Sequence, residues 1–247
     1  MRASIEEIYD RMINKDKILT KKGKISFVLG DISIIVKQRD VVGNIMQEWV
    51  EGWLKKNNID YALNDNTQMP PDFYLNPDNK TKELMEIKAF NYKAGPGFDI
   101  ADFRMYEQEI ARKPWMLDVD YLIFGYDMSE KGIVTIKKVW QKKVWEMSRP
   151  MRSGSQKTIW PLNLQIKKGT VHKMRPAKWY GNSSKFSIFE SKEDFLSAME
   201  ETVYKNKDTH NDGPDWRSTF LCNYKKHYGV SLKIPRWNDI EKKYVGE

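Results

Sequence analysis

Three residues within 71–88 have types and spacing that could support metal-dependent chemistry. Asp72 stands at the head of a short apolar run, and Glu86 and Lys88 follow a turn-rich stretch at 76–80. Carboxylate oxygens are the hard ligands that Mg²⁺ prefers, and two of them leave coordination places for water and a phosphate oxygen. A neighbouring lysine could orient or deprotonate the attacking water and offset charge on a phosphorane-like transition state. This combination suits phosphodiester hydrolysis.

Two strands must bring these side chains together. The runs 72–75 and 83–89 flank the turn-rich stretch and predict a β-hairpin. Because side chains alternate along a strand, Glu86 and Lys88 project from one face, away from the apolar one, and Asp72 must face the same way to join them. The alternative is that Glu86 and Lys88 form an ordinary solvent-facing pair and that Asp72 merely opens a strand. Spacing alone leaves these interpretations about even.

A helix before the hairpin offers a further acidic group. Residues 40–56 repeat apolar side chains every three to four positions, as a half-buried helix does. On a helical wheel centred on Trp49, Glu48 lies at the edge of the apolar stripe and Glu51 on the solvent side. Glu48 could therefore reach the site. A solvated helix charge is the alternative for Glu48.

The positive charge is concentrated in residues 131–185. This segment contains fourteen lysines and arginines but one acid, Glu146, whereas the whole chain of 247 residues carries a net charge of +8. Tryptophans and short polar residues are interspersed with the cations, a mixture that suits contacts with nucleic-acid phosphates and base edges. A solvated basic surface over an aromatic core is the alternative.

Composition excludes several other classes. One cysteine and three scattered histidines cannot provide an internal disulfide or a Cys/His zinc site. No apolar stretch is long enough to cross a bilayer, and the N-terminus lacks a signal-type segment, so we expect a soluble, cytoplasmic protein. No glycine-rich loop of the Walker type is present, which argues against an NTP-driven motor or a kinase.

The order of the predicted elements indicates an α/β fold with a mixed central sheet flanked by helices. The pattern predicts helices at 4–19, 40–56, about 100–112, 191–204 and 215–227, and strands at 25–37, 72–75, 83–89, 121–126 and 132–137. We expect one domain over 1–247, with a catalytic core at about 38–150 and a loop-rich recognition lobe at about 151–247.

The sequence Pro71-Asp72 followed by Glu86-Ile87-Lys88 resembles the motif of the PD-(D/E)XK nuclease superfamily and, within it, the type II restriction endonucleases. The likeness covers roughly residues 40–126. The Pro-Asp-Phe opening and the stretch 188–196 are similar to the EcoRV type. The stretch 160–176 resembles the NgoBV and NlaIV type of restriction enzyme.

This resemblance implies a restriction-endonuclease-like core in which Asp72 and Glu86 bind Mg²⁺ and Lys88 is the catalytic lysine. Glu48 would correspond to a helix acid near the metal, although its distance from Asp72 departs from the family pattern. A polar loop reads bases in the EcoRV type, and residues 181–185 are similar to it in composition and position. With the nearby cations, the candidate DNA-binding residues are Asn182, Ser183, Ser184, Lys185, Lys173, Arg175 and Lys178.

The resemblance also implies double-stranded DNA as the substrate and a homodimer that places one active site on each strand. The leading interpretation is a Mg²⁺-dependent, sequence-specific type II restriction endonuclease. Two alternatives remain open: a repair or mobile-element nuclease that recognises DNA structure, and a DNA-binding protein whose carboxylates are only structural.

Overall fold

The computed structural model describes residues 1–66, 68–153, 158–181 and 184–246. They form two compact units, each assembled from segments that are separate in the sequence. Unit 1 comprises Met1–Asp65, Pro71–Phe98 and Asp120–Lys142, and unit 2 comprises Asn66–Pro70, Asp99–Val119 and Lys143–Glu247. The division into a core at 38–150 and a lobe at 151–247 remains a prediction about function. None of the described helices is long and apolar enough to cross a membrane.

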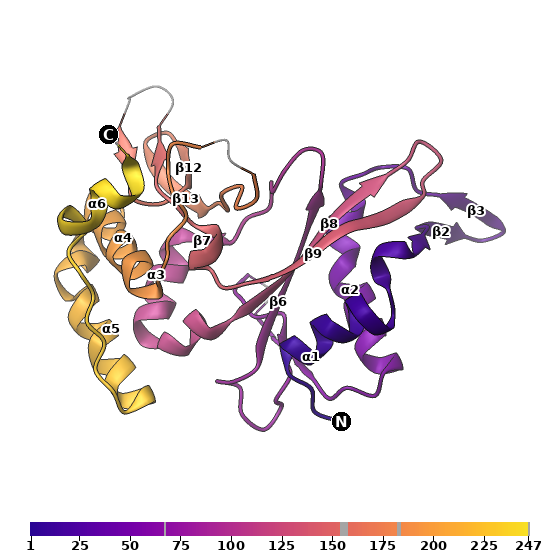
Figure 1. Cartoon of the computed structure of the whole chain (residues 1–247), viewed down its shortest axis with the longest axis horizontal. Coiled ribbons are helices and arrows are strands. Elements are labelled where there is room, and N and C mark those ends of the chain that lie inside the picture. The colour runs from indigo at the N-terminus through magenta and orange to yellow at the C-terminus, as the bar shows by residue number, and fades with distance from the viewer. Residues whose placement is uncertain (67, 154–157, 182–183, 247) are drawn as a thin grey trace. The chain divides into compact units, whose positions relative to one another are not determined.

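Unit 1 is built on a six-stranded sheet (Figure 1). Its strands, in spatial order, are β1 (Lys22–Gly23), β9 (Val134–Lys142), β8 (Asp120–Met128), β6 (Leu84–Asn91), β5 (Phe73–Tyr74) and β4 (Ala62–Leu63). Strands β6 and β8 run parallel, and the other neighbouring pairs are antiparallel. The sheet is therefore mixed, as the sequence predicts.

One face of this sheet is covered by helices. The helices of unit 1 are α1 (Ile5–Asp10), a π-helical turn (Arg11–Lys15), a 3₁₀ turn (Ile18–Thr20) and α2 (Val41–Lys56). Apolar side chains of α1 and α2 pack with Met85 and Ile87 of β6 in one hydrophobic core. The prediction of one regular helix over 4–19 is wrong in its second half: the helix widens into a π-helical turn over Arg11–Lys15 and ends before Lys17, which adopts a left-handed backbone with φ of 51°.

The segment 25–37 forms a hairpin, so the prediction of a single strand is wrong there. Its strands are β2 (Ser26–Leu29) and β3 (Ile32–Ile35). Gly30, in the turn between them, has φ of +57°, a conformation that glycine adopts without a steric penalty. The apolar residues on both sides of the turn make the run look continuous in sequence. Figure 1 shows this hairpin projecting from the rest of unit 1.

Unit 2 is largely helical. It contains α3 (Phe103–Arg112), α4 (Lys192–Lys205), α5 (Gly213–Tyr228), α6 (Trp237–Val245) and 3₁₀ turns at Pro114–Asp118, Trp145–Met147 and His210–Asp212. Its strands are β7 (Ala101–Asp102), β12 (Leu164–Lys167) and β13 (Thr170–Met174) in one sheet and the pair β10 (Met151–Arg152) and β11 (Ile159–Trp160). The side chain of Ser191 caps α4 by accepting a hydrogen bond from the backbone of Asp194 at 3.1 Å, as predicted.

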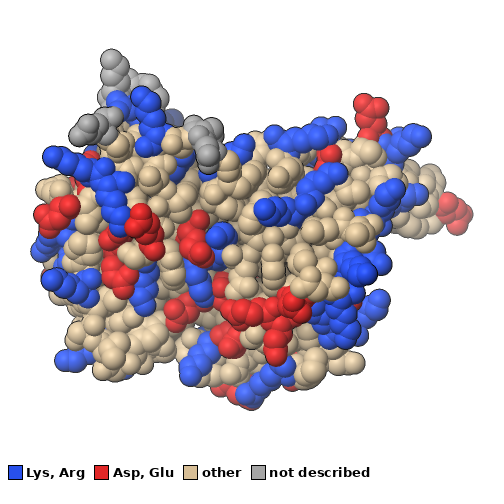
Figure 2. Space-filling model, viewed as in Figure 1, with Lys and Arg blue, Asp and Glu red and all other residues tan. Residues whose placement is uncertain are grey.

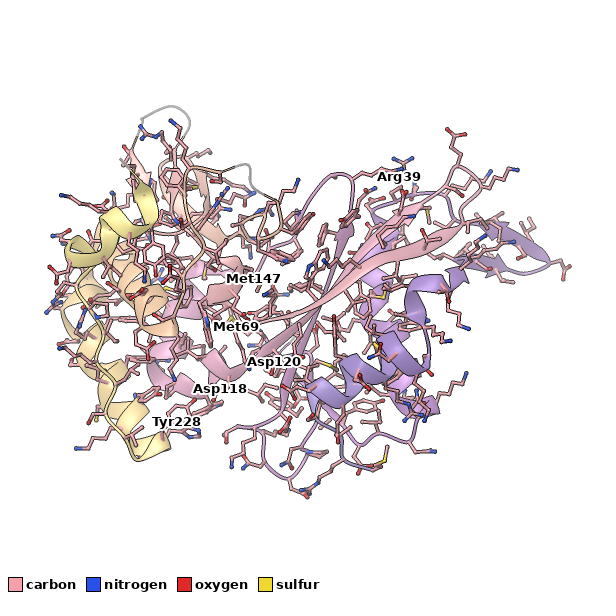
Figure 3. The ribbon with its side chains drawn as sticks, in the orientation of Figure 1. Arg39, Met69, Asp118, Asp120, Met147 and Tyr228 are labelled. Atoms are coloured by element: carbon pink, nitrogen blue, oxygen red, sulfur yellow. The ribbon has the colours of Figure 1, made fainter. Side chains whose placement is uncertain are left out.

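A partly buried polar contact joins the C-terminal end of α5 to the 3₁₀ turn at Pro114–Asp118. The hydroxyl of Tyr228 donates a hydrogen bond to the carboxylate of Asp118 at 2.5 Å, and Figure 3 shows the two labelled side chains close together. Burial and the negative charge of Asp118 raise the pKa of Tyr228. The phenol therefore stays protonated and remains a donor.

Candidate active site

The hairpin of β5 and β6 brings Asp72 to Glu86. The antiparallel register pairs Phe73 with Met85, so the residue just before β5 comes opposite Glu86. The carboxylate of Asp72 accepts a hydrogen bond from the backbone N–H of Ile87 at 2.7 Å. The predicted hairpin is confirmed, and its register places Asp72 beside the strand that carries Glu86 and Lys88.

Alternation along β6 separates the chemistry from the core. Met85 and Ile87 point into the hydrophobic core of unit 1. Glu86 and Lys88 point to the other face, where Lys88 Nζ lies 2.6 Å from Glu86 Oε1. Glu86 is only 4% exposed. The alternative of an ordinary solvent-facing pair is therefore wrong, because such a pair would leave its carboxylate in water.

The surroundings of Asp72 disfavour its negative charge. Burial raises the pKa of Asp72 to about 7, and the negative charge of Glu86 adds to this effect, against the hydrogen bond from Ile87 and the charge of Lys88. Oε2 of Glu86 is buried and has no hydrogen-bond partner among the described residues. An unpaired buried carboxylate oxygen is costly in free energy, and a divalent cation would offset that cost.

The donor set fits a hard divalent cation. Within the part of the chain that the structure describes, no group of three or more His, Cys, Asp or Glu side chains gathers at one point. Asp72 and Glu86 would therefore be the protein's own carboxylate ligands. Two carboxylates with open positions for water and phosphate oxygens are the usual way in which Mg²⁺ is bound.

The acidic side chains of α2, Glu48 and Glu51, do not point in the predicted directions. Glu48 is exposed, whereas Glu51 is partly buried and accepts a hydrogen bond from the hydroxyl of Tyr61 at 2.7 Å. The predicted orientations are wrong because the buried stripe is centred near Met46 and Val50, about one residue from Trp49, which is itself 45% exposed. One residue rotates a helix by about 100°. A catalytic role for Glu48 remains a prediction and gains no support from this orientation.

The candidate DNA-binding residues differ in their surroundings. Asn182 and Ser183 lie outside the described residues. Ser184, Lys185 and Lys178 are exposed. By contrast, two cations on or after β13 are engaged by carboxylates: Lys173 with Asp102 at 3.6 Å, and Arg175 with Asp99. Lys173 and Arg175 would have to exchange these partners to bind phosphate.

An aromatic group beyond Lys88 was not identified from the sequence. On the face of β6 that carries Glu86 and Lys88, Phe90 stacks on Trp140 at 5.7 Å between ring centroids, and Tyr92 stacks on Trp140 at 6.2 Å. Gly125 lies beneath the rings, where a Cβ atom would come within 2.9 Å of Tyr92. The sequence signal for this group is the alternation of Glu86, Lys88, Phe90 and Tyr92, which places all four side chains on one face of the strand. These rings give the site an apolar border on the strand.

The mixed sheet and the arrangement of Asp72, Glu86 and Lys88 are typical of a class of DNA-cutting enzymes, the restriction endonucleases. Sequence comparison shows the family. The chain belongs to the NgoBV restriction endonuclease family, whose model matches residues 2–244. The predicted likeness to the NgoBV and NlaIV type is thereby confirmed, and so is the prediction of a type II restriction endonuclease.

Two relatives are close in sequence. The type II restriction enzyme NlaIV of Neisseria lactamica is 54% identical over 245 residues, which cover 99% of this chain and 98% of the relative. The type II restriction enzyme NgoBV of Neisseria gonorrhoeae is 48% identical over 168 residues, which cover 68% of this chain and 92% of the relative.

A solved structure confirms the fold. The NlaIV restriction endonuclease matches with a TM-score of 0.95 and 53% sequence identity, covering 100% of this chain and 98% of that one. The predicted mixed α/β restriction-endonuclease-like fold is therefore confirmed.

Proposed function

We propose that this enzyme cuts double-stranded DNA at a specific sequence by Mg²⁺-dependent hydrolysis of a phosphodiester bond in each strand. The observation that carries the proposal is the pairing of Asp72 with the Glu86–Lys88 strand, which leaves a buried Glu86 oxygen without a partner among the described residues. Membership of a restriction endonuclease family supports the substrate class.

Asp72 and Glu86 would hold the Mg²⁺ ion, and the bound ion would supply positive charge and acidify water. The N–H of Ile87 fixes one oxygen of Asp72, so the carboxylate is oriented before any ligand arrives. Lys88 is held at Glu86 and is 20% exposed in its side chain, so its ammonium can still meet substrate. There it would orient the attacking water and offset charge on the phosphate.

The exposed cations of the basic segment would hold the DNA backbone. Lys178 and Lys185 are exposed, and each phosphate contact releases counterions from the duplex. Base recognition would fall to the polar loop at 181–185, including Asn182 and Ser183, together with Lys173 and Arg175 once these release their carboxylates. Backbone contacts position the protein, and contacts to base edges determine which sequence is cut.

We also propose a homodimer. The two strands of a duplex run in opposite directions, and this chain offers one candidate site within its described residues. A twofold pair of chains would place one site on each strand of a palindromic sequence.

A digest of a fully sequenced plasmid with Mg²⁺, followed by sequencing of the fragment ends, tests this function. We expect discrete fragments with one shared end sequence. Asp72→Ala should abolish cutting but retain DNA binding. Asp78→Ala provides the matched control, because Asp78 follows a proline in the same hairpin yet lies in its exposed turn, paired with Arg2.

The digest also distinguishes the alternatives. Smeared products, or cutting only at branches and ends, would indicate a nuclease that recognises DNA structure. Salt-dependent binding without cleavage in any divalent metal would indicate a non-catalytic DNA-binding protein.

A further inference from the structure

A cavity in unit 2, hereafter the arginine cavity, gathers positive charge. Its volume is about 500 Å³, within the range of roughly 300–1,000 Å³ that is usual for ligand sites. Three cations line it, Arg149, Arg152 and Lys185, and none of its described lining residues is acidic. The rest of the lining is mainly apolar and includes Ile159 and Phe186. Figure 2 shows Lys and Arg side chains, in blue, gathered at the end of unit 2 where the C-terminus lies in Figure 1.

The pairing of β10 with β11 supplies one wall of the arginine cavity. The register pairs Arg152 with Ile159 and Met151 with Trp160. Directly paired residues share a face of an antiparallel ribbon, and Trp160 is buried, so its face is the one turned to the interior. Arg152 is exposed on the other face, beside Ile159. Strand alternation therefore aims this arginine out of the core and into the cavity lining.

The wall that carries Lys185 is fastened to the end of α6. The N–H of Ser187 donates a hydrogen bond to the carbonyl of Tyr244 at 3.0 Å. A Cβ atom at Gly246 would come within 3.4 Å of the carbonyl oxygen of Lys185, so the two backbones lie close together. These contacts form within the chain itself. The cavity is thus shaped before a ligand arrives, as ligand sites usually are.

Arg149 is a half-buried cation without an acidic partner. One of its terminal N–H groups faces the carbonyl of Phe186 at 3.5 Å, and its Nε is buried without a hydrogen-bond partner among the described residues. Within the part of the chain that the structure describes, neither Arg149 nor Arg152 nor Lys185 forms an ion pair with a carboxylate. Burial lowers the pKa of Arg149, yet an arginine side chain keeps its charge in proteins. A partly buried, unpaired charge is costly in free energy, and a bound anion would offset that cost.

We propose that the arginine cavity binds one phosphate and the adjoining deoxyribose of the DNA backbone, with Arg149 and Arg152 as the phosphate-binding residues. The inference rests on the proposed function, because it takes DNA as the substrate. A guanidinium group binds two phosphate oxygens through parallel N–H groups. The apolar side chains of Ile159 and Phe186 suit the uncharged sugar. Such a contact positions the duplex and does not read its sequence.

DNA binding by full-length variants tests these contacts. The probe is a fluorescent duplex of about 30 base pairs and arbitrary sequence, titrated without metal over a salt series. Arg149→Gln and Arg152→Gln should each lower the affinity at least about tenfold and make the slope of log affinity against log salt shallower by about 1. Arg236→Gln is the matched control, because Arg236 is an exposed arginine of the same unit that pairs with Glu200 at 3.2 Å. Variants that bind like this control would overturn the proposal.

Arg149→Lys separates a phosphate contact from a structural role. This variant keeps the charge but lacks the planar fork. We expect it to restore the wild-type salt slope while its affinity stays between those of the wild type and Arg149→Gln. An Arg149→Lys variant as weak and as salt-insensitive as Arg149→Gln would contradict phosphate binding. Chemical denaturation followed by circular dichroism checks that each variant is folded.

A measurement on the wild-type protein avoids any folding defect. Phenylglyoxal modifies arginine side chains, and mass spectrometry of peptides shows which ones have reacted. The duplex should suppress labelling of Arg149 and Arg152 and leave labelling of Arg236 unchanged. Inorganic phosphate at the same phosphate concentration, and polyglutamate at the same charge concentration, should suppress neither. Equal protection by inorganic phosphate would indicate a site for a free anion, equal protection by polyglutamate a site for an acidic protein, and either result would refute the DNA contact.

The outcome is separable from that of the proposed function. Lys88→Ala should fail to cut DNA, yet the duplex should protect its Arg149 and Arg152 as in the wild type. Arg149→Gln should cut at close to the wild-type rate once protein is saturating, but more slowly at limiting protein. Protection of both arginines in a wild type that never cuts DNA would contradict only the cleavage. Normal cutting by Arg149→Gln and Arg152→Gln at limiting protein would contradict only the arginine cavity.

Discussion

The carboxylate of Asp72 accepts a hydrogen bond from the backbone N–H of Ile87, 2.7 Å away on the strand that carries Glu86 and Lys88. This bond connects the two sides of the hairpin formed by β5 and β6. It holds one carboxylate next to another in a partly desolvated place, where the pKa of Asp72 rises to about 7. The protein thus keeps two acids together that a cation would stabilise.

Asp72→Asn should stabilise the metal-free protein at alkaline pH. The pKa of Asp72 is about 7 in the folded protein against an ordinary 3.8, so the folded state retains its proton longer. The contribution of Asp72 to the free energy of unfolding is therefore present in full below pH 4 and is lost as the pH rises through 7. We expect the variant to gain a few kcal/mol at pH 8 and almost nothing at pH 4. Urea unfolding at both pH values measures this.

Added Mg²⁺ provides the complementary control. It should stabilise the wild type at pH 8 and leave the Asp72→Asn variant nearly unchanged. Equal stabilisation of both proteins would mean that the ion binds elsewhere.

Lys88→Ala should lower the single-turnover cleavage rate at least about 10³-fold, because the site would lose the group that we propose orients water and offsets developing charge. DNA affinity should change less than about threefold. Lys138→Ala is a suitable control, since Lys138 is an exposed cation of the same sheet and lies 5.7 Å above the ring of Trp140. Equal losses in both variants would indicate general electrostatics rather than a catalytic lysine.

Lys178→Ala and Lys185→Ala should each weaken DNA binding at all sequences. Both side chains are exposed within the basic segment. Loss of one phosphate contact should make the slope of log affinity against log salt shallower by about 1. Fluorescence anisotropy over a salt series measures the slope. Lys226→Ala, at an exposed position near the end of α5, is the comparison, and an equal change there would show that the effect is not local.

Glu107→Gln should reduce the loss of folding stability that unit 2 undergoes at high pH. Glu107 on α3 is 1% exposed, and neither of its carboxylate oxygens has a hydrogen-bond partner among the described residues. Burial raises its pKa to about 8, with a contribution from Asp212. Stability is therefore lost as the pH rises through 8, and the glutamine variant should lose less between pH 6 and 9.

Thermal unfolding of wild type and variant over that pH range measures the difference. Glu109→Gln, on the same helix and paired with Lys113, should keep the wild-type pH dependence. If both variants follow the wild type, Glu107 does not titrate as described.

The grouping of Asp72, Glu86 and Lys88 can be predicted from the sequence because the information for it is local. Asp72, Glu86 and Lys88 lie within one hairpin, and the alternation of Met85 to Lys88 indicates which side chains face the core. The mixed sheet followed from the same type of pattern. The burial of Glu86 was not predictable, because it depends on packing that the hairpin sequence does not contain.

Other features depend on tertiary contacts. The rotation of α2 was misjudged because Trp49 is apolar yet exposed, and its neighbours alone do not reveal that. The pairing of Asp102 with Lys173 joins positions far apart in the chain. The sequence does not predict helix α6, because a nine-residue segment gives little periodic signal. Nor does it predict the turn at Gly30, because apolar residues on both sides make the run resemble one strand.

We propose that Asp72, Glu86 and Lys88 form one Mg²⁺-dependent cleavage site. The most direct test is the rate of plasmid cleavage, measured over a range of Mg²⁺ concentrations, for Glu86→Gln and for Asp78→Asn. We expect Glu86→Gln to cut at least about 10³-fold more slowly at every Mg²⁺ concentration, and Asp78→Asn to match the wild type. Cleavage by Glu86→Gln at the wild-type rate and with the wild-type Mg²⁺ dependence would show that Glu86 does not belong to the cleavage site.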